Sequence, residues 1–140
     1  MVLNRVDKDF FQVDKRIYYE QFDRENAKKG TTMVELGWDR AFALEQSGDD
    51  EEMLTELLKL FCDSSSSDMA KIKQAYAVKN AHELAAAAHS IKGAAASLGI
   101  EGIRQCAHDL EKAGNAGDLS NAETMMGNLA FLLNKANDMK

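Results

Sequence analysis

The sequence contains no proline, the residue that most strongly interrupts helices. Residues that favour helices, namely alanine, leucine, lysine, glutamate and methionine, recur throughout the chain. The missing proline and this composition together predict an all-α protein. A chain of 140 residues is long enough for one domain that needs no metal or disulfide to hold its core together.

Cysteine is scarce, and long apolar runs are missing. The two cysteines, Cys62 and Cys106, fall on apolar helical faces, which favours buried reduced thiols; a disulfide is the less favoured alternative. No stretch approaches the roughly 20 apolar residues that span a bilayer, so we expect no membrane association. Asp7 and Asp9 stand where a signal peptide would be apolar. We therefore expect a cytoplasmic protein.

An excess of positive charge is also missing. The formal net charge is −6, and residues 34–140 carry ten Lys or Arg against seventeen Asp or Glu. Because the phosphates of nucleic acids require a basic surface, this acidic body argues against a nucleic-acid partner.

Helix boundaries are marked by capping residues and glycines. A capping residue followed three positions later by glutamate predicts helix starts at Thr32-x-x-Glu35, Asp49-x-x-Glu52, Asn80-x-x-Glu83 and Ser120-x-x-Glu123. The glycines expected where helices stop are Gly48, Gly99 and the pair Gly114 and Gly117. We interpret the serine-rich residues 64–67 as a short break or bend.

Apolar residues recur with helical spacing between these boundaries. The clearest stripe consists of Leu84, Ala88, Ile91, Ala95 and Leu98, the pattern of a bundle helix. Methionines at positions 53, 69, 125 and 126 share this spacing, which predicts that they lie in the core. Short connections at 99–101 and 114–119 make the last helices antiparallel neighbours. We therefore expect an antiparallel up-and-down four-helix bundle over residues 34–140. Residues 1–33 are polar but rich in aromatics, and we expect additional N-terminal helices or a partly disordered leader there.

His89 is the candidate functional residue. It lies about 100° around the helix from Ala88, and therefore at the edge or outside of the core stripe. The residues expected to share its face are mostly small and comprise His82, Ala85, Ala86, Lys92, Gly93 and Ala96. A glycine inside a helix costs about 1 kcal/mol relative to alanine and needs a reason. A lone histidine is more often structural, but this open surface with one cation favours an imidazole that a protein partner can reach.

The chemistry of imidazole fits such a surface. Near neutral pH much of an unperturbed histidine is an uncharged nucleophile that can take a phosphoryl group from an acyl phosphate. Lys92 could offset charge on the phosphoryl oxygens. The sequence offers no evident metal cage, so a metal assisting the transfer would have to come with the partner.

Residues 89–99, HSIKGAAASLG, resemble the signature H-S-[LI]-K-G-[SA]-A-x-[NS]-[LI]-G of histidine-containing phosphotransfer (HPt) domains. The resemblance covers roughly residues 34–137. It includes Gly37-Trp38-Asp39 through Phe61, with Gly48-Asp49, and continues down to Leu110-Glu111. The Ser64–Ser67 run departs from the acidic-Ser-Pro turn that the family often has at this point.

The resemblance implies a phosphoryl carrier in a multistep His–Asp relay, without kinase activity or an ATP-binding domain of its own. His89 would accept a phosphoryl group from a receiver-domain aspartate and pass it to another receiver. Lys92 would stabilise the phosphoryl group, and Gly93 would open the surface to the receiver. Ala85, Ala86, Ala96 and His82 would contact the partner. The partners would be response-regulator receiver domains, a hybrid histidine kinase, or both. No cofactor of its own is implied, and Mg²⁺ would be supplied by the receiver.

Three other interpretations remain open. His82-Glu83-Leu84 resembles the start of a histidine-kinase H-box, but the proline of such boxes is missing and nothing resembles a nucleotide-binding domain. A di-metal bundle would require Glu-x-x-His pairs, and no histidine here has glutamate three residues before it. A module that docks and regulates a receiver or kinase without carrying phosphate is the most serious alternative.

Overall fold

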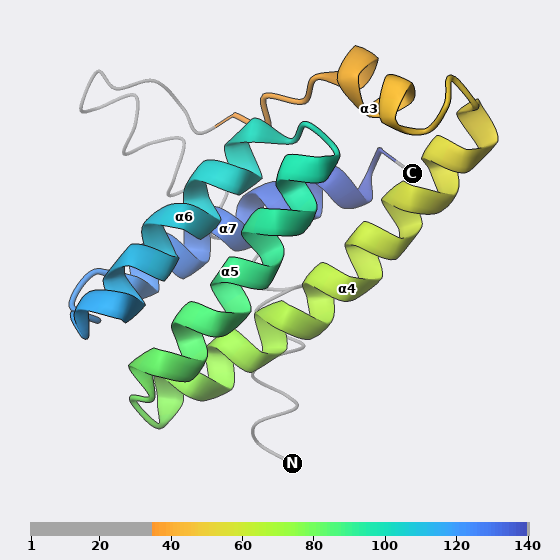
Figure 1. Cartoon of the computed structure of the whole chain (residues 1–140). Helices are drawn as coiled ribbons and strands as arrows, with labels where there is room; N and C mark the ends of the chain where they lie inside the picture. The colour runs from red at the N-terminus through yellow and green to blue at the C-terminus, as the bar shows by residue number, and fades with distance from the viewer. Residues whose placement is uncertain (1–34, 140) are drawn as a thin grey trace. The chain divides into compact units, whose positions relative to one another are not determined.

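The computed structural model describes residues 35–139, and this part of the chain is all-helical, as the composition predicted. Its helices are α3 (Arg40–Gln46), α4 (Glu51–Ala77), α5 (Ala81–Ser97), α6 (Glu101–Ala116) and α7 (Ala122–Asn137), shown in Figure 1. They belong to the unit Leu36–Lys140. The extension expected over residues 1–33 lies outside the described residues. None of the described helices is both long enough and apolar enough to cross a membrane.

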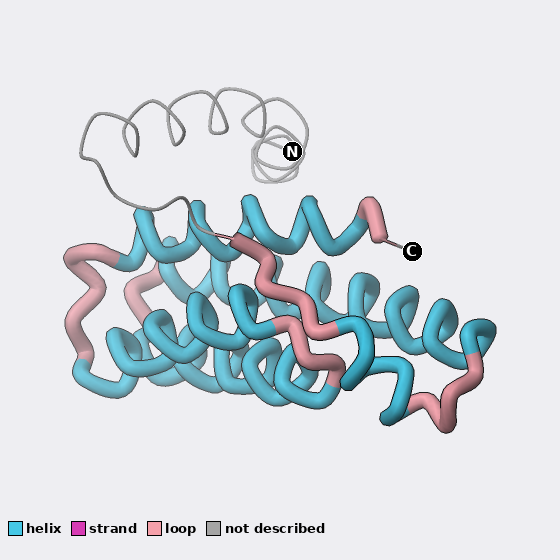
Figure 2. Tube along the Cα trace, turned by 90° about the horizontal axis from the view of Figure 1, so that it is seen from above, coloured by secondary structure: helices cyan, strands magenta, loops and turns pink. Residues whose placement is uncertain are grey.

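Helices α4 to α7 form the predicted up-and-down bundle, in which each helix runs antiparallel to the next (Figures 1 and 2). Helix α5 packs between α4 and α6, and α7 packs against both α4 and α6. The predicted stripe of α5 is confirmed, because all five of its residues are buried, with Leu98 the most exposed at 6%. The largest fully buried side chains come from all four helices and include Leu54, Met69, Ile72, Leu84, Ile91, Ile103, Leu110, Leu129 and Leu132.

The predicted break at residues 64–67 is wrong, because α4 runs through it for 27 residues, or about 40 Å. Serine weakens a helix only slightly and does not stop it. The buried face also keeps its helical phase through this stretch, passing from Phe61 to Ser65 and on to Met69. Ser65 is 1% exposed and takes an apolar residue's place in the stripe.

The predicted helix starts are partly confirmed. The side chain of Asn80 caps α5 by accepting a hydrogen bond from the backbone N–H of Glu83. Helix α4 is capped by Asp50, one residue after the predicted Asp49. Helix α7 begins after Asn121, and the hydroxyl of Ser120 donates to Asp118 and does not cap it. Thr32 lies outside the described residues.

Of the four glycines predicted to end helices, one lies inside a helix instead. Gly48 and Gly99 each follow the C-cap residue of a helix, and Gly117 ends α6 in the left-handed conformation. Gly114, however, lies inside α6 and is buried. A Cβ at Gly114 would lie 2.8 Å from both the carbonyl oxygen of Ala81 and the Cβ of Ala85. This glycine therefore allows α5 and α6 to approach closely.

The turn between α5 and α6 holds the segment that precedes α3. The indole Nε1 of Trp38 donates to the carbonyl oxygen of Leu98 at 3.0 Å. The backbone N–H of Asp39 donates to the carbonyl oxygen of Gly99 at 2.9 Å. Gly99 has a φ of +68°, and a Cβ there would lie 2.9 Å from a ring carbon of Phe42. Only glycine fits this turn without strain. The turn thus fixes the end of α5, the helix that carries His89.

Candidate functional site

His89 lies in the middle of α5, on the outside of the bundle. Its side chain is 66% exposed, whereas Ala88 and Ile91 on the same helix are completely buried. His89 is exposed because the apolar stripe of α5 faces the core, and His89 lies outside that stripe. The ring is therefore within reach of a large partner.

One nitrogen of the ring is already engaged. Nδ1 of His89 lies 2.8 Å from Oε2 of Glu111 on α6, and Nζ of Lys92 lies 2.7 Å from the other carboxylate oxygen, Oε1. Within the described part of the chain, Nε2 makes no hydrogen bond. We call these three residues the His89 cluster. The exposed ring thus has Nδ1 in contact with Glu111 and Nε2 free to react.

The carboxylate of Glu111 is the electrostatic centre of the His89 cluster. Lys92 lowers the pKa of Glu111 most, the hydrogen bond with His89 lowers it further, and partial burial opposes both. Glu111 is therefore ionised near neutral pH, and an ionised carboxylate can only accept hydrogen bonds. Its side chain is 16% exposed and that of Lys92 is 26% exposed, so both are screened less by solvent than surface ions are.

A second hydrogen bond holds α5 from its other side. The hydroxyl of Ser90 donates to Oδ2 of Asp68 on α4 at 2.8 Å. Asp68 is only 7% exposed and also lies 3.9 Å from the ammonium of Lys71. The helix that carries His89 is thereby fixed by a polar contact on each side, to α4 and to α6.

The surface around His89 is open where glycine stands. A Cβ built at Gly93 would meet no atom within 4 Å, so no packing requirement explains the glycine. Ala86, Ala96 and His82 are exposed on the same face. Ala85 is not part of this surface: it is 4% exposed, because Gly114 lets α6 pack directly against it. The expectation that Ala85 contacts a partner is therefore wrong.

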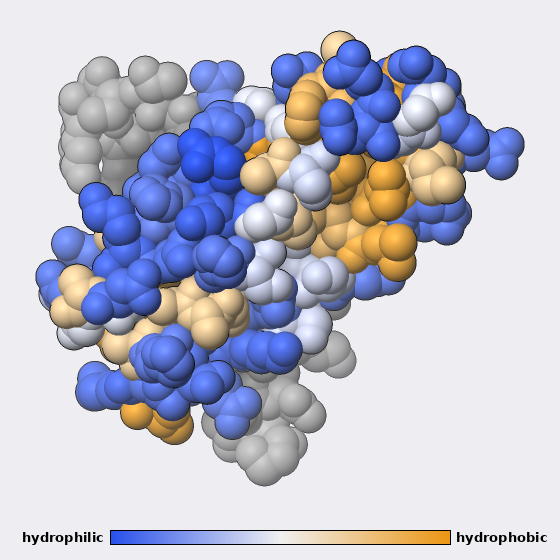
Figure 3. Space-filling view, in the orientation of Figure 1, coloured by the Kyte–Doolittle hydropathy of each residue, from blue (hydrophilic) through white to orange (hydrophobic). Residues whose placement is uncertain are grey.

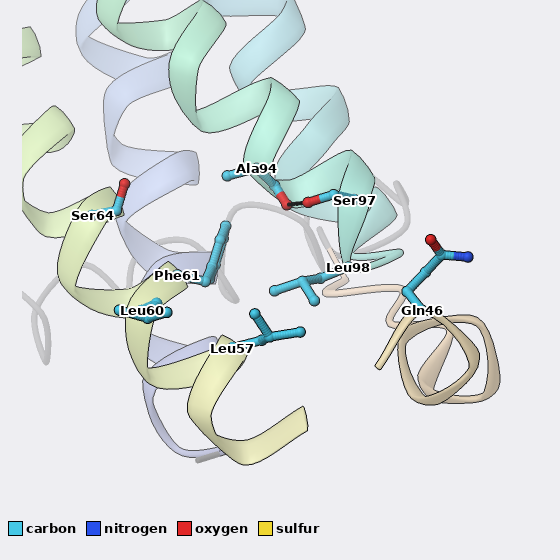
Figure 4. Close-up of a pocket in the computed structure, with 8 residues that line it drawn as sticks. All are labelled: Gln46, Leu57, Leu60, Phe61, Ser64, Ala94, Ser97 and Leu98. Carbon is cyan, nitrogen blue, oxygen red and sulfur yellow. Dashed lines mark hydrogen bonds between the residues drawn. The ribbon is translucent and has the colours of Figure 1, made fainter. Parts of the chain in front are cut away.

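An apolar groove lies beside this surface, between α4 and the C-terminal half of α5. Its volume is about 410 Å³, and Figure 4 shows its lining residues, Gln46, Leu57, Leu60, Phe61, Ser64, Ala94, Ser97 and Leu98. Figure 3 shows hydrophobic surface gathered over this side of α4, where Leu60 is 62% exposed. Met53 is 48% exposed, so its predicted place in the core is wrong, whereas Met69 and Met126 are buried as predicted. Met125 is half-buried.

The sequence did not predict the contact between Glu111 and His89. The resemblance reached this residue, but helical spacing relates only residues on one helix, and Glu111 lies 22 residues from His89 on the next helix. The pairing depends on how α5 and α6 are aligned, which the close contact at Gly114 sets. No signal in a single sequence reports that alignment.

Comparison with known proteins agrees with the geometry. A family model described as Hpt domain matches residues 56–138, a range that includes the whole His89 cluster and more than half of the chain. No curated protein and no solved structure matches. The chain belongs to the Hpt domain family, whose members are phosphocarrier modules that act through histidine phosphotransfer in phosphorelay signalling.

Proposed function

We propose that this protein carries a phosphoryl group between receiver domains of a multistep His–Asp relay. Nε2 of His89 accepts the group from the aspartate of one receiver and passes it to that of another. The observation that supports this most directly is the ring itself: it is 66% exposed, with Nδ1 engaged by Glu111 and Nε2 open. The family match covers the same residues.

The transfer needs little from this chain besides a positioned nucleophile. The lone pair of Nε2 attacks phosphorus in line, the bond from phosphorus to the aspartate oxygen breaks, and the receiver keeps its carboxylate. The reverse of this step on a second receiver returns His89 to its starting form. The Mg²⁺ that such transfers use is expected to come with the receiver.

Lys92 is the cation proposed to stabilise the transferred group. It lies on the turn after His89, and its Nζ is within 2.7 Å of Glu111 in the unphosphorylated protein. Because its side chain is long and flexible, it can turn from the carboxylate toward the phosphoryl oxygens as a point charge. Gly93 leaves space for the receiver to approach the ring, which a side chain at that position would occupy.

The proposed partners are receiver domains of response regulators, a hybrid histidine kinase, or both. The protein is proposed to have no kinase activity of its own, and therefore to depend on a phosphorylated receiver for loading. The cytoplasmic location stays a prediction.

Incubation with a phosphorylated receiver domain and Mg²⁺ tests the proposal. The expected product is an acid-labile, base-stable phosphoryl adduct that is lost in His89→Gln. His108→Gln, a change of the histidine on α6, is the matched control and should label like the wild type. Equal labelling of His89→Gln would refute the proposal. Binding of receivers without any labelling would instead indicate a docking module that carries no phosphate.

A further inference from the structure

We infer that Asp68 is a positioning residue for the phosphoryl transfer. Through its hydrogen bond with Ser90 it fixes the rotation of α5, and with it the direction in which His89 presents Nε2 to a receiver. This inference rests on the proposed function, because it concerns how the ring meets the phosphorylated aspartate of the partner. It assigns a role to a residue on α4, whereas the residues implied by the sequence motif all lie on α5.

Asp68 is a buried carboxylate with one close partner. It is 7% exposed, and within residues 35–139 it is the only charged residue that is buried. The hydroxyl of Ser90 donates to its Oδ2 at 2.8 Å, whereas the ammonium of Lys71 lies 3.9 Å from its Oδ1 on a side chain that is 70% exposed. An ion pair with so exposed a lysine contributes little. Ser65, one turn earlier on α4, is buried as well, but its hydroxyl makes no hydrogen bond. Ser90 is therefore the main partner of the Asp68 carboxylate.

A buried carboxylate at this position is a poor choice for stability alone. Removing a charge from water is costly, and an apolar residue at a buried position often stabilises a fold equally well or better. A hydrogen bond adds direction, because its strength depends on the distance and angle between the two groups. The contact between Ser90 and Asp68 therefore favours one orientation of α5 relative to α4.

The hydrogen bonds of His89 and Ser90 restrain α5 against rotation in opposite senses. Helix α5 lies between α4 and α6 (Figure 1), and the two consecutive residues are both exposed on its outer side. His89 contacts Glu111 on α6, and Ser90 contacts Asp68 on α4. A rotation that brings His89 closer to α6 carries Ser90 away from α4, and the reverse rotation separates His89 from α6. Only a narrow range of rotation satisfies both contacts.

The buried face of α5 restricts this rotation only weakly. Four of the six buried residues within the helix are alanines, namely Ala85, Ala87, Ala88 and Ala95. The methyl groups of alanines form shallow ridges, which interlock with a neighbouring helix less than large side chains do. A small rotation therefore changes the packing of the core little, and the polar contacts decide the angle.

The position of Nε2 is sensitive to this angle. The Cα atoms of a helix lie about 2.3 Å from its axis and an imidazole reaches roughly 5 Å further, so a rotation of about 10° moves Nε2 by about 1 Å. A misplacement of about 1 Å can slow a reaction about 100-fold. A docked receiver holds its aspartate in one place and cannot follow the ring, whereas a small donor in solution can approach from another direction. Loss of the Asp68 contact should therefore slow transfer from a receiver selectively.

The rotation of α5 can be measured without any phosphoryl group. Residual dipolar couplings of the backbone N–H groups vary periodically along a helix, and the phase of this variation reports the rotation of the helix about its axis. Asp68→Ala and Ser90→Ala should each shift this phase in α5 relative to α6 by about 10° or more. Asp68→Asn should keep it, because the amide oxygen can still accept from Ser90. Glu123→Ala, which removes an exposed carboxylate from α7, is the matched control. An unchanged phase in either Asp68→Ala or Ser90→Ala would overturn the inference.

Single-turnover transfer separates the orientation of the ring from the docking of the receiver. In Asp68→Ala the rate at saturating phosphorylated receiver should fall about ten-fold or more, with little change in the receiver concentration that gives half of that rate. Asp68→Asn should restore most of the rate. Phosphoramidate, a small donor that needs no docked receiver, should label the wild type and Asp68→Ala at similar rates. Equal maximal rates of transfer from the receiver, or equal slowing with both donors, would contradict the inference. Failure of every receiver to label wild-type His89 would instead refute the proposed function, while the dipolar couplings would still decide whether Asp68 sets the rotation of α5.

Discussion

Gly93 and Gly114 are two helical glycines for which the structure predicts different effects of the same substitution to alanine. At Gly93 a Cβ would meet no atom within 4 Å, and the backbone is helical. Gly93→Ala should therefore raise the free energy of unfolding by about 1 kcal/mol, the difference between the two residues in a helix. For a domain of this size that corresponds to an increase in Tm of about 3–5 °C.

At Gly114 the added methyl group has no space. Its Cβ would lie 2.8 Å from the carbonyl oxygen of Ala81 and from the Cβ of Ala85, and neither group can move away without shifting α5. Overpacking of this kind costs about 1–3 kcal/mol, against about 1 kcal/mol gained in helix preference. Gly114→Ala should therefore be neutral to destabilising by up to about 2 kcal/mol. Urea unfolding followed by circular dichroism measures both variants.

A transfer assay tests whether Gly93, which lowers the stability of α5, is needed for the approach of the receiver. Gly93→Leu should slow transfer from a phosphorylated receiver, because the side chain would occupy the approach to the ring. Labelling by phosphoramidate, which needs no docked receiver, should be nearly unchanged. If Gly93→Ala lowered the free energy of unfolding, the claim that a side chain has free space at this position would be refuted. Normal transfer with Gly93→Leu would show that the open surface is not where the receiver lands.

Three further predictions concern charged and titratable side chains. Lys92→Ala should slow transfer from a receiver roughly ten-fold, through loss of about 1.4 kcal/mol of charge stabilisation, and single-turnover kinetics measures this. Because the pKa of Glu111 is lowered in the fold, its contribution to stability is present above the ordinary carboxyl pKa of 4.5 and is lost as pH falls through the lower folded value. Urea unfolding between pH 6 and pH 3 should therefore show a steeper loss in the wild type than in Glu111→Gln. Burial raises the pKa of the Cys106 thiol to about 11, so at pH 8 an aromatic disulfide reagent should modify it roughly 100-fold more slowly than free cysteine.

Much of the bundle could be predicted from the sequence because its signals are local. The stripe from Leu84 to Leu98 and the cap at Asn80 depend on residues within a few turns of one helix, and both are confirmed. The predicted break at residues 64–67 is absent because the weak helix preference of serine does not outweigh the continuous buried face of α4. The helix propensity of a residue contributes little free energy, and the burial of an apolar helix face outweighs it.

Only the site residues that lie together on one helix could be predicted from the sequence. His89 and Gly93 were found because an exposed ring and an unexplained glycine lie on the same face of α5. Ala85 was misplaced because its burial depends on Gly114 of the neighbouring helix. Glu111 was missed for the same reason, since its contact with His89 exists only after α5 and α6 have packed.

Locating the phosphoryl group on a single nitrogen tests the central claim most directly. The protein is loaded from a phosphorylated receiver with Mg²⁺, and phosphorus–nitrogen NMR correlations, together with mass spectrometry of the base-stable peptide, identify the modified atom. The account predicts one phosphoryl group, bonded to Nε2 of His89. A phosphoryl group on another residue, or on Nδ1 of His89, would contradict it.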